Sequence, residues 1–219
     1  MKVLSTNIGK PVEFIYKGKT SNSSFFRKPQ ASGIEIKFHT VVGDEFAGKN
    51  IHGTKESIVY AYSRKAQEQL EKIFQKDIPF GHVGENLTMD ELFEKDFQVG
   101  SVYSIGTAEL KARSPRYPCN RFNLCFHGDQ YQKLFETFNR PGVYFEVIKE
   151  GFIKPGDTFK LLKKGASLFT VLDQYNFMFL LRNDPPKLNL KVLTQVANDP
   201  EMPSLFKKAF KARLNELGK

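Results

Sequence analysis

The chain has 219 residues, of which 40% are hydrophobic and 26% are charged, and its formal net charge at pH 7 is +9. This composition excludes a largely disordered protein, because it offers enough apolar surface to bury a core without disulfides or metals. No apolar run approaches the ~20 residues that a membrane-spanning helix needs, so we expect no membrane association. The surplus of positive charge favours anionic partners such as phosphorylated cofactors, nucleic acids or acidic proteins.

Two cysteines, Cys119 and Cys125, are too few for a disulfide scaffold. The first residues contain one lysine, Lys2, with no apolar region behind it, so the sequence predicts no signal peptide. We therefore expect a cytoplasmic protein in which both thiols are reduced.

Short strands are predicted along residues 1–163. Residues 33–38 alternate apolar and charged side chains, which is typical of a half-buried strand. Strands are expected over residues 2–6, 12–16, 34–38, 57–62, 101–105, 109–113, 143–149 and 158–162. One helix is predicted over residues 64–75 with Ser63 as its N-cap, and another over 130–139 with Asp129 and Gln132 as a capping box.

Beyond residue 163 the apolar residues recur at helical spacing, and three helices are expected from Thr170 onward. Asn183-Asp184-Pro185-Pro186 separates the first two, and Pro203 precedes the third. The sequence thus predicts a mainly β domain over residues 1–163, built as a barrel or sandwich, and a small helical subdomain over residues 164–219.

The first candidate loop contains Gly43-Asp44 and then His52-Gly53-Thr54-Lys55. Glycines let backbone amides converge on an anion, and His52 and Lys55 add donors and charge. A solvated glycine-rich loop is the alternative interpretation.

The second candidate is Gly81-His82-Val83-Gly84-Glu85-Asn86, in which a carboxylate and an amide lie on a tight backbone. Glu85 and Asn86 could read the donor and acceptor edge of a heterocycle. A turn in which the asparagine binds its own backbone explains the same residues.

The third candidate places Cys119 among Arg113, Arg116 and Arg121, with Pro115 and Pro118 holding the chain extended. Positive charge near a thiol favours the thiolate, which is a nucleophile and a ligand for soft metals. A buried, inert cysteine is the alternative, and we expect that role for Cys125, which lies between Leu124 and Phe126.

The order and spacing of these motifs resemble the MOSC domain, named for the C-terminal domain of molybdenum cofactor sulfurase. Residues 24–29, 142–144 and 151–157 fit the same pattern, and the helical tail resembles the stand-alone bacterial YiiM-type branch. The resemblance covers almost the whole chain. It implies a mainly β fold, a MOSC-type β-barrel with a few peripheral helices and a C-terminal three-helix appendage. The sequence departs from the family at Thr54, where a second glycine is usual, and at Arg27, where lysine is frequent.

The resemblance also implies a function. MOSC domains bind the molybdenum cofactor, a pterin dithiolene with a phosphate, and YiiM-type proteins are similar to reductases of N-hydroxylated compounds such as N-hydroxylaminopurine base analogues. We therefore expect an oxidoreductase supplied with electrons by a separate reductase, with Cys119 as molybdenum ligand and His52 as the first candidate for proton relay. Asp44 is expected to brace a loop. The residues expected to bind the cofactor or shape its pocket are Arg27, His52, Lys55, Gly84, Glu85, Asn86, Arg113, Arg116 and Cys119.

Two other functions remain open from the sequence. Cys119 could carry sulfur as a persulfide without turnover of a small substrate. A non-enzymatic module could instead use the net charge to bind anions, although the absence of a stacking-aromatic motif argues against nucleic acid as its partner. For the C-terminal helices three roles are open: the face of a homodimer, a lid, or packing against the barrel.

Overall fold

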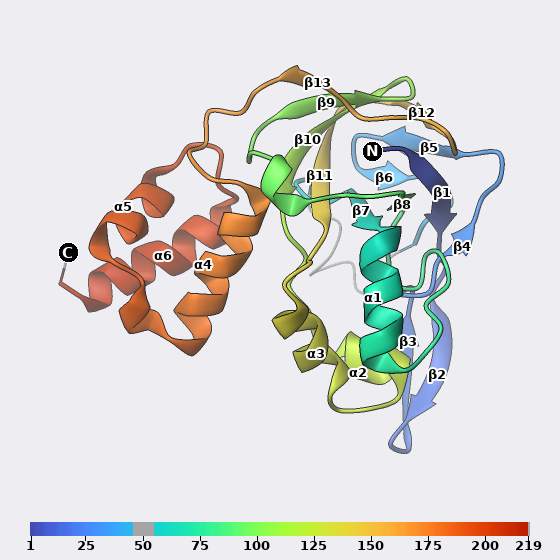
Figure 1. The fold of residues 1–219 in the computed structure, drawn as a ribbon, viewed down its shortest axis with the longest axis horizontal. Helices are drawn as coiled ribbons and strands as arrows, with labels where there is room; N and C mark the ends of the chain where they lie inside the picture. Colours follow the sequence, from blue (N-terminus) through green and yellow to red (C-terminus); the bar gives the residue numbers. More distant parts are fainter. Residues whose placement is uncertain (46–54, 219) are drawn as a thin grey trace.

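The computed structural model describes residues 1–45 and 55–218. Within them the largest sheet has eight strands in the order β13-β9-β10-β11-β7-β8-β1-β4, and two smaller sheets pair β12-β5-β6 and β2-β3 (Figure 1). The strand bounds are Val3–Ile8 (β1), Val12–Tyr16 (β2), Lys19–Ser23 (β3), Lys28–Pro29 (β4), Ile34–Lys37 (β5), Thr40–Val41 (β6), Val59–Ser63 (β7), Leu87–Met89 (β8), Val102–Ile105 (β9), Ala108–Ser114 (β10), Val143–Lys149 (β11), Gly151–Ile153 (β12) and Lys160–Lys163 (β13).

Where apolar and charged side chains alternate along the sequence, the predicted strand is present in the structure. In β5, Ile34 and Ile36 are buried while Glu35 and Lys37 are exposed, as the alternation predicts. The polar strand β3 is not indicated by the sequence pattern. It forms because it pairs along its whole length with β2 in an antiparallel hairpin.

The strand pairing corrects the prediction of a closed barrel. In the described part of the chain the order of the largest sheet begins at β13 and ends at β4, and no pairing joins these two strands. The short strand β4 ends at Pro29, which has no N–H for a further ladder. The strand β13 is exposed along its length and forms the other edge. The fold is therefore a mixed, sheet-dominated fold with helices packed on it.

The helix α1 (Arg64–Phe74) lies in the connection between the parallel strands β7 and β8. Ser63 caps it as predicted, since its side chain accepts a hydrogen bond from the Ala66 N–H. The connection then continues through residues 81–86, here called the glycine loop, before β8 begins. A parallel pair needs such a crossover, and in this chain the crossover carries one of the candidate motifs.

Two short helices follow β10. The sequence pattern does not indicate α2 (Arg121–Phe126), whose buried Phe122 and Phe126 belong to an aromatic core cluster. The helix α3 (Tyr131–Phe138) starts near its predicted position, but the capping box of Asp129 and Gln132 is wrong. Asp129 instead pairs with Lys17, and the Gln132 N–H donates to the Asn123 side chain.

The predicted C-terminal helices are present as α4 (Val171–Asn183), α5 (Leu190–Asn198) and α6 (Ser204–Glu216), gathered on one side of the sheet (Figure 1). Short 3-10 turns span Glu94–Asp96 and Pro185–Lys187. One core cluster contains both strand residues such as Val147 and helix residues such as Val196 and Phe210. The helices thus share a core with the sheet, and the division at residue 163 stays a prediction. None of the described helices is long and apolar enough to cross a membrane.

Candidate functional site

Arg27, which precedes β4, forms a buried ion pair with Asp44, which follows β6. Its Nε lies 3.0 Å from Oδ1 of Asp44, and one terminal nitrogen lies 2.7 Å from Oδ2. The other terminal nitrogen donates to the carbonyl of Gly84 in the glycine loop. The two side chains are 7% and 0% exposed, so the charge of Arg27 is matched by a carboxylate inside the protein.

Asp44 also fixes two other segments. Its Oδ1 accepts a hydrogen bond of 2.7 Å from the Gly9 N–H, and its Oδ2 accepts one of 3.1 Å from the Asn86 side chain. Asp44 therefore braces the surrounding loops, which is the role that the sequence suggests for it.

Glu85 is fully buried and its carboxylate is saturated by donors. Oε1 accepts from the side chains of Gln67 and Thr88 and from the Gly81 N–H, and Oε2 accepts from the Val83 N–H, at 2.6–3.0 Å. Burial raises the pKa of Glu85 above its ordinary value, while these hydrogen bonds oppose the shift. The geometry assigns the residue to holding the glycine loop in shape.

Asn86 is likewise engaged by the protein. Its side-chain oxygen accepts from the Tyr60 N–H at 3.1 Å, and its side-chain nitrogen donates to the Asn7 carbonyl and to Asp44. Of the two roles open from the sequence for Glu85 and Asn86, these contacts favour support of the site over contact with a ligand.

Gly84 adopts a φ of +81°, a conformation that L side chains rarely adopt. A Cβ at this position would lie 2.8 Å from a terminal nitrogen of Arg116. The glycine therefore permits both the loop conformation and the close approach of an arginine from another part of the chain.

Arg116 lies in the cysteine segment, residues 115–119, between β10 and α2. Only 9% of it is exposed, and one terminal nitrogen donates to the Val83 carbonyl at 2.9 Å. Its guanidinium carbon lies 4.9–5.3 Å from ring centroids of Phe25, Tyr60 and Phe122. No carboxylate in the described ranges pairs with it, and the faces of three aromatic rings stabilise its charge.

The two cysteines have different surroundings. Cys119 is partly exposed just before α2 and follows Arg116 by three positions in the same segment. Cys125 is buried, and its sulfur lies 3.7 Å from the Ser23 hydroxyl. Burial raises the pKa of Cys125 to about 11, so its thiol stays protonated near neutral pH. Of the two thiols, Cys119 is the one that solvent or a ligand can reach.

Arg113 is the third predicted arginine, and its charge is matched by acidic side chains. The guanidinium forms ion pairs with Glu56, Glu146 and Glu201. Glu201 also pairs with Lys111 at 2.6 Å, which joins β10 to the turn before α6. These contacts place Arg113 in a network between the sheet and the C-terminal helices.

The two remaining predicted residues are Lys55 and His52. Lys55 is exposed. His52 lies outside the described residues, so its predicted roles in catalysis and in binding stay predictions.

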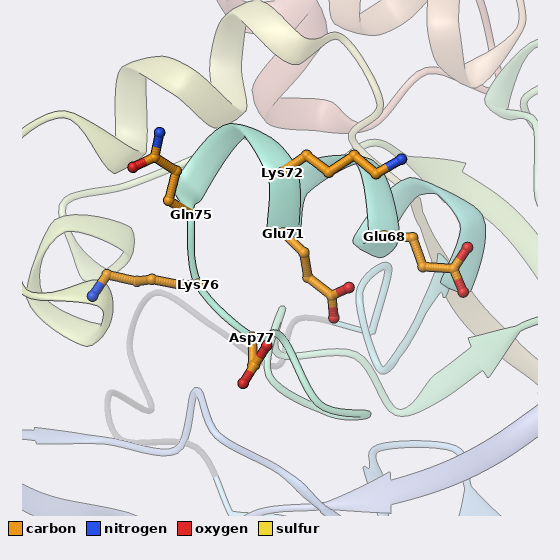
Figure 2. Close-up of a pocket in the computed structure, with 6 residues that line it drawn as sticks. All are labelled: Glu68, Glu71, Lys72, Gln75, Lys76 and Asp77. Carbon is orange, nitrogen blue, oxygen red and sulfur yellow. The ribbon is translucent and has the colours of Figure 1, made fainter.

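A pocket of about 690 Å³ lies at the end of α1 and the turn after it, lined by Glu68, Glu71, Lys72, Gln75, Lys76 and Asp77 (Figure 2). None of the predicted site residues that the structure describes lines it. The Glu71 carboxylate in this pocket pairs with Arg64 and accepts from the Ile78 N–H. Through these contacts Glu71 holds the turn after α1 against the helix.

The donor set of the cysteine segment fits a soft metal carried by an anionic group. A reachable thiol is a ligand of the type that molybdenum with dithiolene sulfurs accepts. An arginine without a carboxylate partner suits a phosphate or another anion, because its guanidinium can donate in a bidentate manner. Cys119 and Arg116 bring these two properties together.

A comparison with protein families identifies the family of the chain. The family model of the MOSC domain matches residues 48–160, just over half of the chain. The chain belongs to the MOSC domain family. This family is associated with binding of the molybdenum cofactor.

Similar sequences occur in bacteria and in a fungus. The chain is 28% identical over 149 residues to the uncharacterised protein YflK of Bacillus subtilis, a match that covers 68% of this chain and 67% of YflK. It is 28% identical over 112 residues to the protein YiiM of Escherichia coli, covering half of each chain. It is 30% identical over 138 residues to a protein of Gibberella moniliformis named reductase, covering 61% of this chain and 24% of that protein.

The fold of this MOSC protein matches a solved structure over nearly its whole length. The crystal structure of YiiM from Geobacillus stearothermophilus superposes with a TM-score of 0.78 at 22% identity, covering 97% of this chain and 98% of that one. Together with the match to YiiM of Escherichia coli, this likeness indicates a MOSC protein of the YiiM type.

Sequence reasoning alone misses the aromatic setting of Arg116. Phe25 precedes Arg27 in a motif that the sequence singles out, but its ring packs on Arg116, 91 positions away along the chain. Tyr60 and Phe122 come from β7 and α2. No local pattern marks these residues, because their common neighbour becomes apparent only after folding.

Proposed function

We propose that this MOSC protein is an oxidoreductase that uses the molybdenum cofactor to reduce N-hydroxylated compounds, such as base analogues of the N-hydroxylaminopurine type. The observation that carries the proposal is that one short segment carries both the partly exposed Cys119 and the Arg116 guanidinium, which has no carboxylate partner in the described residues. A buried, unmatched positive charge is costly for folding, so its presence next to a thiol points to function.

Some of these residues would contact the cofactor, and others hold the contacting residues in place. Cys119 would be the protein ligand of molybdenum, and Arg116 would bind an anionic part of the cofactor. Arg27, Asp44, Glu85 and Asn86 hold the glycine loop whose Val83 carbonyl receives the Arg116 hydrogen bond. Once bound, the cofactor supplies two-electron removal of an oxygen atom, which side chains cannot perform.

The reaction requires two electrons and two protons, because the N–O bond of an N-hydroxyl group breaks and its oxygen leaves as water. The electrons would come from a separate reductase, and the positive net charge suits an acidic partner of this kind. His52 remains the predicted proton donor. His82, in the glycine loop, is a poor donor near neutral pH, because burial lowers its pKa and keeps its ring uncharged.

The fungal relative named reductase is compatible with an oxidoreductase, although the match spans a quarter of that protein. A cytoplasmic location and a role in removing toxic N-hydroxylated compounds belong to the same proposal.

The decisive experiment is elemental analysis for molybdenum on protein produced in a host with an intact cofactor pathway. We expect about one molybdenum per chain, its loss in Cys119→Ser, and its retention in Cys125→Ser, because the Cys125 thiol is buried and protonated. Reduction of an N-hydroxylated base with an artificial electron donor should likewise be lost in Cys119→Ser and retained in Cys125→Ser. Equal molybdenum contents in the two variants would contradict the assignment of Cys119.

The exposure of the Cys119 thiol also supports a second candidate, a sulfur carrier that uses a persulfide. Mass spectrometry of the intact protein distinguishes the two. A mass increase of one sulfur atom on Cys119, in well-folded protein without molybdenum or pterin, would favour the carrier over the reductase.

A further inference from the structure

The cysteine segment has no secondary structure of its own to hold it. Residues 115–119 form neither helix nor strand, and α2 begins only at Arg121. A segment of this kind is fixed by its side chains and by the elements packed against it. Contacts with neighbouring elements therefore set the position of Cys119 relative to Arg116.

Tyr117, two residues before Cys119, is attached to the C-terminal helix α4. Its hydroxyl donates to the main-chain carbonyl of Gln174 at 3.0 Å. Its ring stacks on Tyr175, with centroids 5.6 Å apart and planes 9° apart. The Arg182 guanidinium carbon lies 5.2 Å from the same ring centroid. Tyr117 therefore makes polar, stacking and cation–π contacts with one helix.

The helix that holds Tyr117 is itself joined to α3. Tyr175 is 2% exposed, and its hydroxyl donates to the Glu136 carbonyl at 3.0 Å. From α3, the Gln132 side chain reaches the Pro118 carbonyl at 3.5 Å. The cysteine segment thus lies against α3 and α4, which are bound to each other through Tyr175.

The backbone between Tyr117 and Cys119 is stiff. Proline fixes φ at position 118, and a residue that precedes proline is restricted to extended conformations. A displacement of Tyr117 is therefore transmitted to Cys119 rather than absorbed by the backbone. After Cys119 the chain enters α2, where the Phe122 N–H donates to the Cys119 carbonyl at 3.0 Å.

We infer that Tyr117 is a positioning residue, which through its contacts with α4 fixes the Cys119 thiol relative to the Arg116 guanidinium. This inference rests on the proposed function for the identity of the ligand that Cys119 would hold. It assigns to α4 a role in the framework of the site, beyond the covering of the core.

The test is the rate of alkylation of Cys119 by iodoacetamide in the full, cofactor-free chain, followed peptide by peptide so that Cys125 is measured separately. Tyr117→Phe keeps the ring and removes the hydrogen bond to Gln174. Tyr175→Phe is the matched control, because it removes an equivalent hydrogen bond, to the Glu136 carbonyl, and keeps the ring that stacks on Tyr117. We expect the Cys119 rate to change about fivefold in Tyr117→Phe and to stay within about twofold of the parent in Tyr175→Phe.

Equal rates in the parent and Tyr117→Phe would overturn the inference, as would the same change in both variants. If Tyr117→Phe does not fold, Tyr175→Leu removes the stacking and leaves the Tyr117 hydroxyl in place, and an unchanged Cys119 rate in that variant would also overturn it. Molybdenum content of the same variants, made in a host with the cofactor pathway, separates this inference from the proposed function. A changed alkylation rate in protein that never holds molybdenum would refute the proposed function and leave the positioning role standing.

Discussion

Arg27 and Arg116 donate to neighbouring carbonyls of the same loop, those of Gly84 and Val83, yet they use their charge in opposite ways. Arg27 is locked to the buried carboxylate of Asp44. Arg116 lies among aromatic rings with no carboxylate partner in the described residues. The first arginine holds the structure together, and the second keeps its charge available.

This difference distinguishes the residues that support the site from those that would bind a ligand there. A buried ion pair can be broken only at high cost, because a single partner would be left charged and unpaired. An arginine on aromatic faces keeps much of its ability to bind an anion. The reachable Cys119 lies with the second arginine, so we assign the chemistry to the cysteine segment and the framework to the glycine loop.

The largest expected effect tests the framework. Asp44→Ala leaves Arg27 buried without its carboxylate and should lower the free energy of unfolding by about 3–5 kcal/mol in urea titrations. Glu91→Ala, which breaks the exposed pair with Lys65, is the control and should cost less than about 1 kcal/mol. Similar losses in the two variants would show that the Arg27–Asp44 pair contributes no more than a surface pair.

A smaller effect is expected where the glycine loop contacts the cysteine segment. Gly84→Ala adds a methyl group 2.8 Å from Arg116 at a φ of +81°, and it should lower stability by about 2–4 kcal/mol and reduce molybdenum content. Gly156→Ala is the matched control, because Gly156 has a φ of +97° and nothing within 4 Å of the added carbon. It should cost about 1–2 kcal/mol and leave molybdenum content unchanged. A loss of molybdenum in the control would show that the effect does not pass through Arg116.

The smallest effect concerns the buried thiol. With Cys119→Ser, iodoacetamide can react only with Cys125, whose pKa of about 11 leaves about one thiolate in a thousand at pH 8. Labelling should therefore be slow at pH 8 and accelerate steeply toward pH 11. Because the folded pKa lies above the ordinary value of 9.0, protonation of Cys125 stabilises the fold below pH 9, and this contribution is lost as the pH rises through 11. Rapid labelling at pH 8 would contradict the buried environment.

The fold is predictable where the signal is local. The alternation in residues 34–37 and the cap at Ser63 depend on residues close in sequence, and the structure confirms both. Barrel closure, in contrast, depends on whether the first and last strands of a sheet meet. That is decided by long-range pairing, and the described strands do not close.

By itself, the sequence determined the family, through motifs typical of the MOSC domain, and predicted a chemistry based on a thiol, Cys119, in an extended segment rich in proline and arginine. Only the tertiary structure decided which arginine remains available. Glu56 and Glu201, which match the charge of Arg113, lie 57 and 88 positions away from it along the chain. Charge pairing depends on distance in space. Neither composition nor spacing along the sequence shows which cations form ion pairs in the folded protein.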